Sequence, residues 1–267
     1  MNIRDYQFRT ERYKINIWQN STLSQEFEEL ALKLPDLFPA GGELINSNSR
    51  NTIKAFAKLP NLADFKGKIT VKKFGQRGLY DNLRFRLARS RARRSLLTAS
   101  RIKAAGLQVP KPLAAFEYRV RGNKLAASFY LYKYFPADFN LYSLYDDILD
   151  SSTTEKLLIK LAREIKTMHD AGIFHADLHP KNILFKAREK KGVFALFYLD
   201  FNRAKNFSSL STARRARDLY RLRLPAKHRE LFLSNYDREK KEELKELMDK
   251  YYKWHQRRKS LKNWLKG

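Results

Sequence analysis

The sequence contains no cysteine, which excludes disulfide bonds, thiolate metal sites and cysteine nucleophiles and fits a reducing compartment. It also has no apolar run that approaches the roughly 18 residues of a membrane-spanning helix. Residues 1–19 are polar and charged, so no secretory signal is predicted there. These absences favour a cytoplasmic protein that does not span a membrane.

Acidic residues are scarce, because 28 Asp and Glu stand against 55 Lys and Arg, for a formal net charge of +27. The imbalance is clustered: no acidic residue lies between Asp81 and Glu117, and the charged residues between Asp200 and Asp218 are all basic. Such a protein attracts a polyanion, which is an anionic membrane surface, a phosphorylated substrate or nucleic acid. A merely solvated basic face is the alternative.

One segment carries most of the chemical information: His175-Ala-Asp-Leu-His-Pro-Lys-Asn182, followed by Asp200-Phe-Asn202. Phosphoryl transfer requires a carboxylate beside the acceptor hydroxyl and oxygen ligands that hold Mg²⁺ against the nucleotide phosphates. This segment supplies those groups in order. We therefore predict that Asp177 is the catalytic base and that Asn182 and Asp200 bind Mg²⁺.

The two histidines of this segment have different expected roles. His175 is expected to brace the loop by hydrogen bonds. His179 stands where protein serine/threonine kinases usually carry Lys, so the loop favours a sugar or another small molecule over a protein substrate. Lys181 either contacts phosphate or is a solvated charge.

The elements around this segment follow the order of a kinase C-lobe. Helical periodicity begins at Ser152 and Gly172 is a plausible C-cap. Strands are expected over residues 183–185 and 193–199. No long activation segment follows Asp200, since a helix is expected to begin at Arg217, and Asp218 is expected to brace the catalytic loop from below.

The N-terminal half is predicted to bind the nucleotide. A helix is expected over residues 24–34, ended by Pro35, then strands over residues 41–46 and 52–59. The turn between these strands lacks a glycine-rich pattern. It is either an ordinary hairpin turn or a phosphate-binding turn, whose donors would be Ser47, Ser49, Arg50 and Asn51.

A third strand over residues 68–74 offers two candidates for the lysine that contacts the nucleotide phosphates. Strand alternation places Lys72 and Lys73 on opposite faces, so one of them is expected to reach the phosphates. We prefer Lys72, with Lys73 in reserve. The helix expected over residues 87–105 has no acid to pair with this lysine, and Ser95 occupies the expected position. Either another group, such as the Asp200 carboxylate, holds the lysine, or activity is reduced.

Strands over residues 113–118 and 125–134 lead to Phe135-Pro136, the expected hinge between two lobes. Backbone groups of Lys133 and Tyr134 are expected to meet the adenine of ATP.

Five motifs together resemble the lipopolysaccharide core kinase family, which includes the Kdo and heptose kinases of Gram-negative bacteria. They are Val71-Lys-Lys, Ser90-Arg-Ala-Arg-Arg94, Ala105-Gly-Leu-Gln-Val-Pro-Lys-Pro112, the His175–Asn182 loop and Asp200-Phe-Asn-Arg203. The resemblance implies a protein-kinase-like fold and transfer of phosphate from ATP, with Mg²⁺, to a sugar hydroxyl of the lipopolysaccharide inner core. It also implies a peripheral enzyme at the cytoplasmic face of the inner membrane.

We therefore expect an α+β, bilobal fold with a small β-rich N-lobe and a larger, mostly helical C-lobe. Residues 1–40 would form an extension with a short helix, residues 41–135 the N-lobe and residues 136–267 the C-lobe. A helix is expected over residues 239–249, and residues 251–266 interleave aromatic with basic side chains, as at a membrane interface. A final helix packed on the C-lobe is the alternative.

Two other functions stay open. A RIO-like ATPase would use the positive charge to bind RNA, and we rank nucleic acid below lipopolysaccharide as a partner. A pseudokinase would bind a membrane or a partner without chemistry. The missing helix acid favours it, whereas the intact set of Asp177, Asn182 and Asp200 argues against it.

Overall fold

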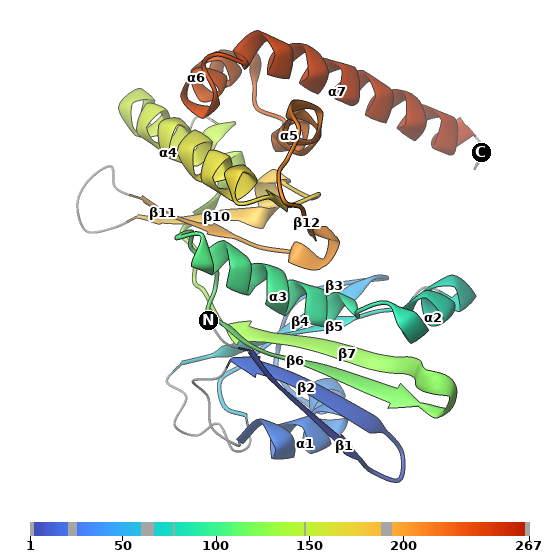
Figure 1. Ribbon diagram of the computed structural model, residues 1–267. Helices are drawn as coiled ribbons and strands as arrows, with labels where there is room; N and C mark the ends of the chain where they lie inside the picture. The colour runs from blue at the N-terminus through green and yellow to red at the C-terminus, as the bar shows by residue number, and fades with distance from the viewer. Residues whose placement is uncertain are drawn as a thin grey trace. The chain divides into compact units, whose positions relative to one another are not determined.

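The computed structural model describes residues 3–20, 26–59, 67–76, 78–146, 148–187 and 194–264. The chain divides into two compact units, one of Met1–Ala104 with Val109–Pro136 and one of Ala105–Gln108 with Ala137–Gly267. The first is built around a β-sheet and the second mostly from helices, which confirms the α+β class (Figure 1). The first unit ends at Pro136, within the predicted hinge.

The first unit contains an antiparallel seven-stranded sheet in the order β1-β2-β6-β7-β5-β4-β3. Its strands are β1 (Ile3–Arg9), β2 (Lys14–Asn20), β3 (Glu43–Asn48), β4 (Asn51–Phe56), β5 (Ile69–Phe74), β6 (Pro112–Val120) and β7 (Lys124–Lys133). The 3₁₀ turn η1 (Arg121–Asn123) joins β6 to β7. Residues that we expected in a separate extension therefore belong to the sheet, because β2 pairs with β6 and buries Ile15 and Ile17.

Helix α1 (Glu26–Ala40) packs on one face of this sheet, with Leu30, Leu34 and Phe38 in the hydrophobic core. The prediction that Pro35 ends this helix is wrong. A proline lacks the N–H that would bond the carbonyl four residues back, and that carbonyl belongs to Ala31. The buried Tyr118 hydroxyl donates to the Ala31 carbonyl at 2.6 Å, so a strand residue supplies the missing donor.

Helices α2 (Gly78–Leu87) and α3 (Arg91–Ala104) belong to the same unit, and α3 lies on the face opposite α1 (Figure 1). We expected one helix from Leu87, but α3 begins at Arg91. Ser90 caps it, because the Ser90 Oγ accepts from the Arg93 amide at 3.1 Å. The fully exposed Leu87 instead ends α2.

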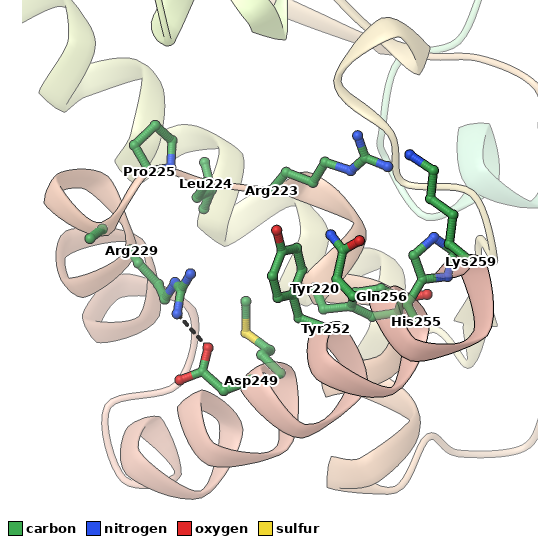
Figure 2. Close-up of a pocket in the computed structure, with 12 residues that line it drawn as sticks. Tyr220, Arg223, Leu224, Pro225, Arg229, Asp249, Tyr252, His255, Gln256 and Lys259 are labelled. Carbon is green, nitrogen blue, oxygen red and sulfur yellow. Dashed lines mark hydrogen bonds and ion pairs between the residues drawn. The ribbon is translucent and has the colours of Figure 1, made fainter. Parts of the chain in front are cut away.

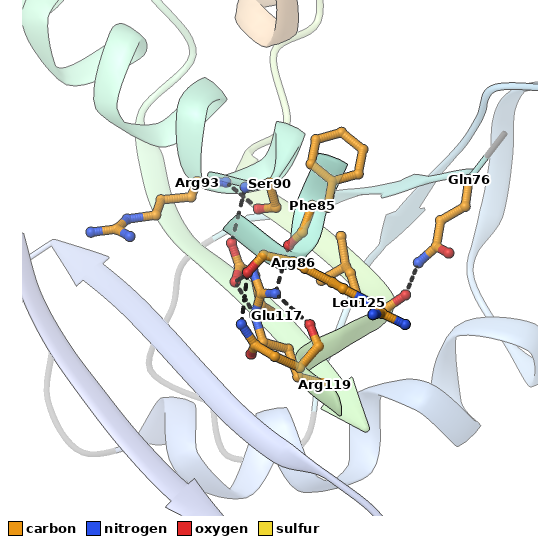
Figure 3. A network of polar contacts seen from close by, with 9 residues as sticks. Gln76, Phe85, Arg86, Ser90, Arg93, Glu117, Arg119 and Leu125 are labelled. Carbon is orange, nitrogen blue, oxygen red and sulfur yellow. Dashed lines mark hydrogen bonds and ion pairs between the residues drawn. The ribbon is translucent and has the colours of Figure 1, made fainter. Parts of the chain in front are cut away.

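A buried polar network joins these two helices to β6 (Figure 3). Both nitrogens Nε and Nη2 of Arg119 donate to the Glu117 carboxylate, at 3.0 and 2.7 Å. The other Glu117 oxygen accepts from the Ser90 amide at 3.2 Å, and Arg119 Nη1 donates to the Phe85 carbonyl at 2.7 Å. The network therefore holds the end of α2 and the start of α3 against the sheet.

The second unit consists of helices, 3₁₀ turns and two small sheets. Its helices are α4 (Ser151–Asp170), α5 (Thr212–Leu219), α6 (Ala226–Tyr236) and α7 (Lys241–Trp264). Its strands are β8 (Phe139–Asn140), β9 (Ile173–Phe174), β10 (Ile183–Ala187), β11 (Phe194–Tyr198) and β12 (Lys205–Asn206). Its 3₁₀ turns are η2 (Leu141–Leu144), η3 (Pro180–Asn182), η4 (Phe201–Arg203) and η5 (Tyr220–Leu222).

The two strands expected between Asn182 and Asp200 are confirmed as β10 and β11, which pair antiparallel. The turn that we expected between them falls largely on residues 188–193, outside the described ranges. The helix expected to begin at Arg217 begins instead at Thr212, capped by Ser211. No helix in the described ranges is long and apolar enough to cross a membrane.

Candidate active site

The predicted catalytic segment lies between β9 and β10 of the second unit. Helix α4 ends at Asp170, and Gly172 turns the chain with φ of +70°. An added Cβ at Gly172 would lie 2.1 Å from the Phe207 carbonyl oxygen, so only glycine fits. The Phe207 amide donates to the Gly172 carbonyl at 2.9 Å, next to the pairing of β9 with β12. The entrance to the loop is thereby fixed by backbone contacts.

Asp218 of α5 braces the loop, as predicted. Its carboxylate is fully buried and accepts from the amides of His175 and Ala176, at 2.7 and 2.9 Å. His169 Nε2 lies 3.3 Å from the same carboxylate. Ala176 has φ of +63°, a conformation that a non-glycine residue adopts only where the surroundings hold it. Two charge-assisted bonds to one carboxylate supply that restraint.

The Asp177 side chain is one quarter exposed and faces two arginines. Its Oδ1 lies 3.9 Å from Arg203 Nη1 and 3.8 Å from Arg221 Nη1. Its backbone carbonyl accepts from the Asn182 side chain at 2.9 Å and from the His179 amide at 2.6 Å. The carboxylate is therefore presented on a closed loop beside two positive charges.

Asn182 and Asp200 offer the amide and carboxylate oxygens that Mg²⁺ accepts as ligands. The Asn182 Nδ2 is used by the Asp177 carbonyl, which leaves Oδ1 on the opposite side of the amide. The Leu199 amide donates to the Asn182 carbonyl at 2.9 Å, so Asp200 follows directly beside it. Asp200 has φ of +62° and is held by a hydrogen bond from the Asn202 side chain.

These two residues fit a magnesium ion that shares its ligands with a nucleotide. Mg²⁺ usually takes one or two protein oxygens and keeps waters or phosphates at its other positions. Among the described residues no group of three or more His, Asp and Glu could hold a metal alone. An amide oxygen and a carboxylate completed by phosphate oxygens match that preference.

Both loop histidines have a pKa below the ordinary value for histidine. Burial lowers the pKa of His175, against the upward pull of Asp218, Asp177 and Asp200. A hydrogen bond with the Leu199 backbone also raises this pKa. The His175 ring packs on the Phe201 ring, with the two ring centres 5.4 Å apart. His175 therefore braces the loop by a hydrogen bond, as we expected, which its backbone amide donates to Asp218, and its ring packs on Phe201.

Burial also lowers the pKa of His179, and Arg223 adds to the effect. The His179 Nε2 lies 3.3 Å from the Tyr142 hydroxyl, and its Nδ1 accepts from the Lys181 amide at 3.4 Å. Both ring nitrogens thus have partners within the unit, which orient the ring.

The first unit carries the residues that we predicted to bind the nucleotide. Lys73 faces α1, because its Nζ lies 5.9 Å from the rings of both Phe38 and Phe129, which belong to the core beneath that helix. Strand alternation puts Lys72 on the other face, where it is 6% exposed. This arrangement favours Lys72 as the lysine that meets phosphate.

Ser95 occupies the position of the missing helix acid and is buried, with its Oγ donating to the Arg91 carbonyl at 2.9 Å. The buried acids on this side of the unit are engaged by arginines: Glu117 by Arg119 and Asp81 by Arg91, at 2.7 Å in each case.

The turn that we considered for phosphate binding is closed by its own side chain. Asn48 Oδ1 accepts from the amides of Arg50 and Asn51, at 2.9 and 3.0 Å. An asparagine that bonds the backbone ahead of it is typical of an ordinary hairpin turn. The two amides are therefore engaged, and Arg50 and Asn51 could reach phosphate only with their side chains.

The amides of the predicted adenine contacts are also engaged. The Lys133 amide donates to the Lys111 carbonyl and the Tyr134 amide to the Lys68 carbonyl, both at 2.9 Å. Any backbone contact of these two residues with adenine would therefore use their carbonyl groups.

The model of the lipopolysaccharide kinase (Kdo/WaaP) family matches residues 46–260. The chain belongs to this family. The resemblance that the five sequence motifs indicate is thereby confirmed.

Two known members of this kinase group are similar to the chain. A 3-deoxy-D-manno-octulosonic acid kinase of Vibrio cholerae serotype O1 is 31% identical over 121 residues. The match covers 43% of this chain and 45% of that relative, so it spans less than half of either protein. The solved structure described as WaaP in complex with acyl carrier protein has a TM-score of 0.64 and 19% identity. It covers 88% of this chain and 96% of that one, and confirms the kinase-like fold.

Sequence reasoning about this kinase family member missed the role of Arg221. Arg203 appeared only as part of a motif and of a basic stretch, and Arg221 in no motif. Both guanidinium groups meet Asp177 because η4 and η5 converge on the loop. The only sequence signal was the high density of arginine after Asp200.

Proposed function

We propose that this protein transfers the γ-phosphoryl group of ATP to a hydroxyl of a Kdo or heptose sugar in the lipopolysaccharide inner core. The observation that carries the proposal is the loop on which Asp218 positions Asp177 and Asn182, in a chain of the lipopolysaccharide kinase family. Asp177 orients the acceptor hydroxyl and accepts its proton.

Mg²⁺, held by Asn182 and Asp200, would neutralise the charge of the nucleotide phosphates. Arg203 and Arg221 lie within 4 Å of the Asp177 carboxylate, where the acceptor oxygen must approach. Fixed positive charges at that position stabilise the negative charge that phosphoryl transfer develops. Lys72 is the proposed contact to the α- and β-phosphates.

We place the enzyme peripherally at the cytoplasmic face of the inner membrane. The last turns of α7 expose Tyr252, Trp254, Leu261 and Trp264 among Lys and Arg side chains. Exposed aromatic and basic residues on one helix favour an anionic membrane interface, where each basic residue contributes about 1 kcal/mol. The predicted contact of Leu265 lies outside the described residues.

The proposal is tested by transfer of labelled phosphate from ATP·Mg²⁺ to purified inner-core lipopolysaccharide. Wild type should label the lipid, and Asp177→Ala should lose this activity by at least about 10²-fold, since general-base catalysis contributes that much. Asp146→Asn, which alters an exposed acid of the same unit, is the matched control and should retain activity.

Other outcomes would change the assignment. Nucleotide hydrolysis without transfer to lipid, combined with salt-sensitive RNA binding, would favour the RNA-associated ATPase. Absence of both hydrolysis and transfer would favour the pseudokinase.

A further inference from the structure

A basic pocket of about 370 Å³ lies in the second unit, where α5 and η5 meet α7. Five of its lining side chains are Lys or Arg, and the described residues that line it include no Asp or Glu. These five are Arg203, Arg217, Arg221, Arg258 and Lys259. Five positive charges converge on one concave surface without a lining acid to neutralise them.

The pocket adjoins the catalytic carboxylate. Arg203 and Arg221 line the pocket and also place a nitrogen 3.9 and 3.8 Å from the Asp177 Oδ1. A molecule that presents a hydroxyl to Asp177 would therefore extend into this pocket.

The electrostatic surroundings of the pocket favour an anion. The Nε of Arg221 is buried and has no hydrogen-bond partner within the described residues. His255, which also lines the pocket, has a lowered pKa, first because of burial and then because of Arg221, Arg223, Lys259 and Arg258. An unsatisfied guanidinium nitrogen and several cations around one imidazole mark a site short of negative charge.

Aromatic rings form the other walls. The Arg258 guanidinium lies 4.8 Å from the ring of Trp254, and Tyr220 stacks on Tyr251 with ring centres 6.0 Å apart. Small-molecule sites commonly combine aromatic walls with a few convergent polar groups. This combination suits a ring that carries a negative charge.

A neighbouring cavity of about 400 Å³ is a weaker candidate (Figure 2). It shares Tyr220, His255 and Lys259 with the basic pocket, but it contains the acid Asp249. The Asp249 carboxylate pairs with Arg229 at 2.7 Å, so part of its positive charge is already neutralised. Arg203 and Arg221, the ion-pair partners of Asp177 within the described residues, do not line this cavity.

We propose that the basic pocket binds an anionic group, a carboxylate or a phosphate, of the acceptor sugar and so determines which hydroxyl reaches Asp177. This inference rests on the proposed function. Arg217 and Arg258 are then specificity-determining residues that act on the acceptor and not on ATP.

Binding measured without catalysis tests the inference. The probes are 3-deoxy-D-manno-octulosonic acid, its uncharged methyl ester and inorganic phosphate, each titrated into the full chain and followed by NMR. Arg258→Gln is compared with Arg257→Gln, which removes the same charge from the adjacent, exposed position of α7 outside the pocket lining.

We expect Arg258→Gln to bind the sugar acid at least fivefold more weakly than wild type, and Arg257→Gln to bind it like wild type. The uncharged methyl ester should bind wild type and both variants with the same affinity. Arg217→Gln, on α5, should repeat the loss, which separates it from a local disturbance of α7. The same pattern with inorganic phosphate but not with the sugar acid would identify phosphate as the bound group.

Equal binding by Arg258→Gln and Arg257→Gln, or no binding of any charged probe to wild type, would overturn the inference. These outcomes are independent of phosphate transfer. If wild type labels the lipid but Arg258→Gln and Arg257→Gln bind the sugar acid equally, the proposed function stands and the role of this pocket is overturned. Binding of the sugar acid that depends on Arg258, without any phosphate transfer, would overturn the proposed function and leave the pocket as an anion site without an acceptor role.

Discussion

At the scale of single residues, Asp218 supports the loop that carries Asp177 through two hydrogen bonds to backbone amides. One buried carboxylate accepts two consecutive loop amides, and a buried charge is tolerable only with such partners. The loop conformation, including the positive φ of Ala176, depends on it. The site is therefore as rigid as the packing of α5 that holds this residue.

The buried His175 predicts a pH dependence of stability. Its pKa in the folded protein lies below the ordinary value of 6.5, so the unfolded chain binds a proton first as the pH falls. The stability contribution is full above pH 6.5 and is lost below it, with a slope of at most about 1.4 kcal/mol per pH unit for one group.

Urea unfolding between pH 7.5 and pH 5.5, values chosen to span about one unit on either side of that pKa, measures this dependence. We expect His175→Gln to flatten the profile more than His255→Gln, since His255 is far less buried. A profile that keeps its slope in His175→Gln would assign the pH dependence to other groups.

At the scale of elements, the first unit depends on polar contacts that reach between distant segments. The Tyr118 hydroxyl allows α1 to continue through Pro35, and the Lys54 ammonium donates to the carbonyls of Phe38 and Gly41 at the end of that helix. Both donors come from strands of the sheet. The helix is therefore completed by the surface on which it packs.

We predict that removing one partner of the buried Glu117–Arg119 pair strongly lowers the free energy of unfolding. Glu117→Gln leaves the Arg119 guanidinium buried without its counter-charge, which costs about 3–5 kcal/mol for a buried pair. Glu43→Gln is the matched control, because the Glu43–Lys68 pair of the same unit is exposed and screened by solvent, so its loss should hardly change stability.

Denaturant unfolding of the two variants measures the difference. Glu117→Gln should also destabilise the first turn of α3, because the Ser90 amide donates a hydrogen bond to the same carboxylate. Similar midpoints for Glu117→Gln and Glu43→Gln would show that the buried pair does not stabilise the unit.

At the scale of the whole molecule, the net charge of +27 and the exposed end of α7 predict association with anionic membranes. The double variant Leu261→Gln/Trp264→Gln removes two large apolar side chains, which are 57% and 77% exposed. Each contributes about 1.5–3 kcal/mol when buried, so vesicle binding should weaken at least tenfold.

Sedimentation with phosphatidylglycerol–phosphatidylethanolamine vesicles measures this effect at two salt concentrations. The control Leu83→Gln/Leu87→Gln alters two exposed leucines of α2 in the same way. This control variant should bind the vesicles like wild type, and added salt should weaken vesicle binding by both wild type and the control. If both double variants lose vesicle binding equally, or neither loses any, the end of α7 does not contact the membrane.

Much of the candidate site could be predicted from the sequence because its groups are close together along the chain. The spacing of Asp177, Asn182 and Asp200 and the cap at Gly172 follow from local order, and the five motifs together identified the family. Strand alternation likewise separated Lys72 from Lys73, although their contact with a nucleotide stays a prediction.

Only the tertiary structure decided the features that depend on partners far apart in sequence. The hydroxyl of Tyr118 lets α1 pass Pro35, β1 and β2 join the sheet through β6, and Arg221 meets Asp177 across the fold of the second unit. Local sequence specifies conformational preference and chemical type. It does not specify which distant hydrogen-bond donor, strand or charged group will contact a given residue, because the packing of the whole unit determines those contacts.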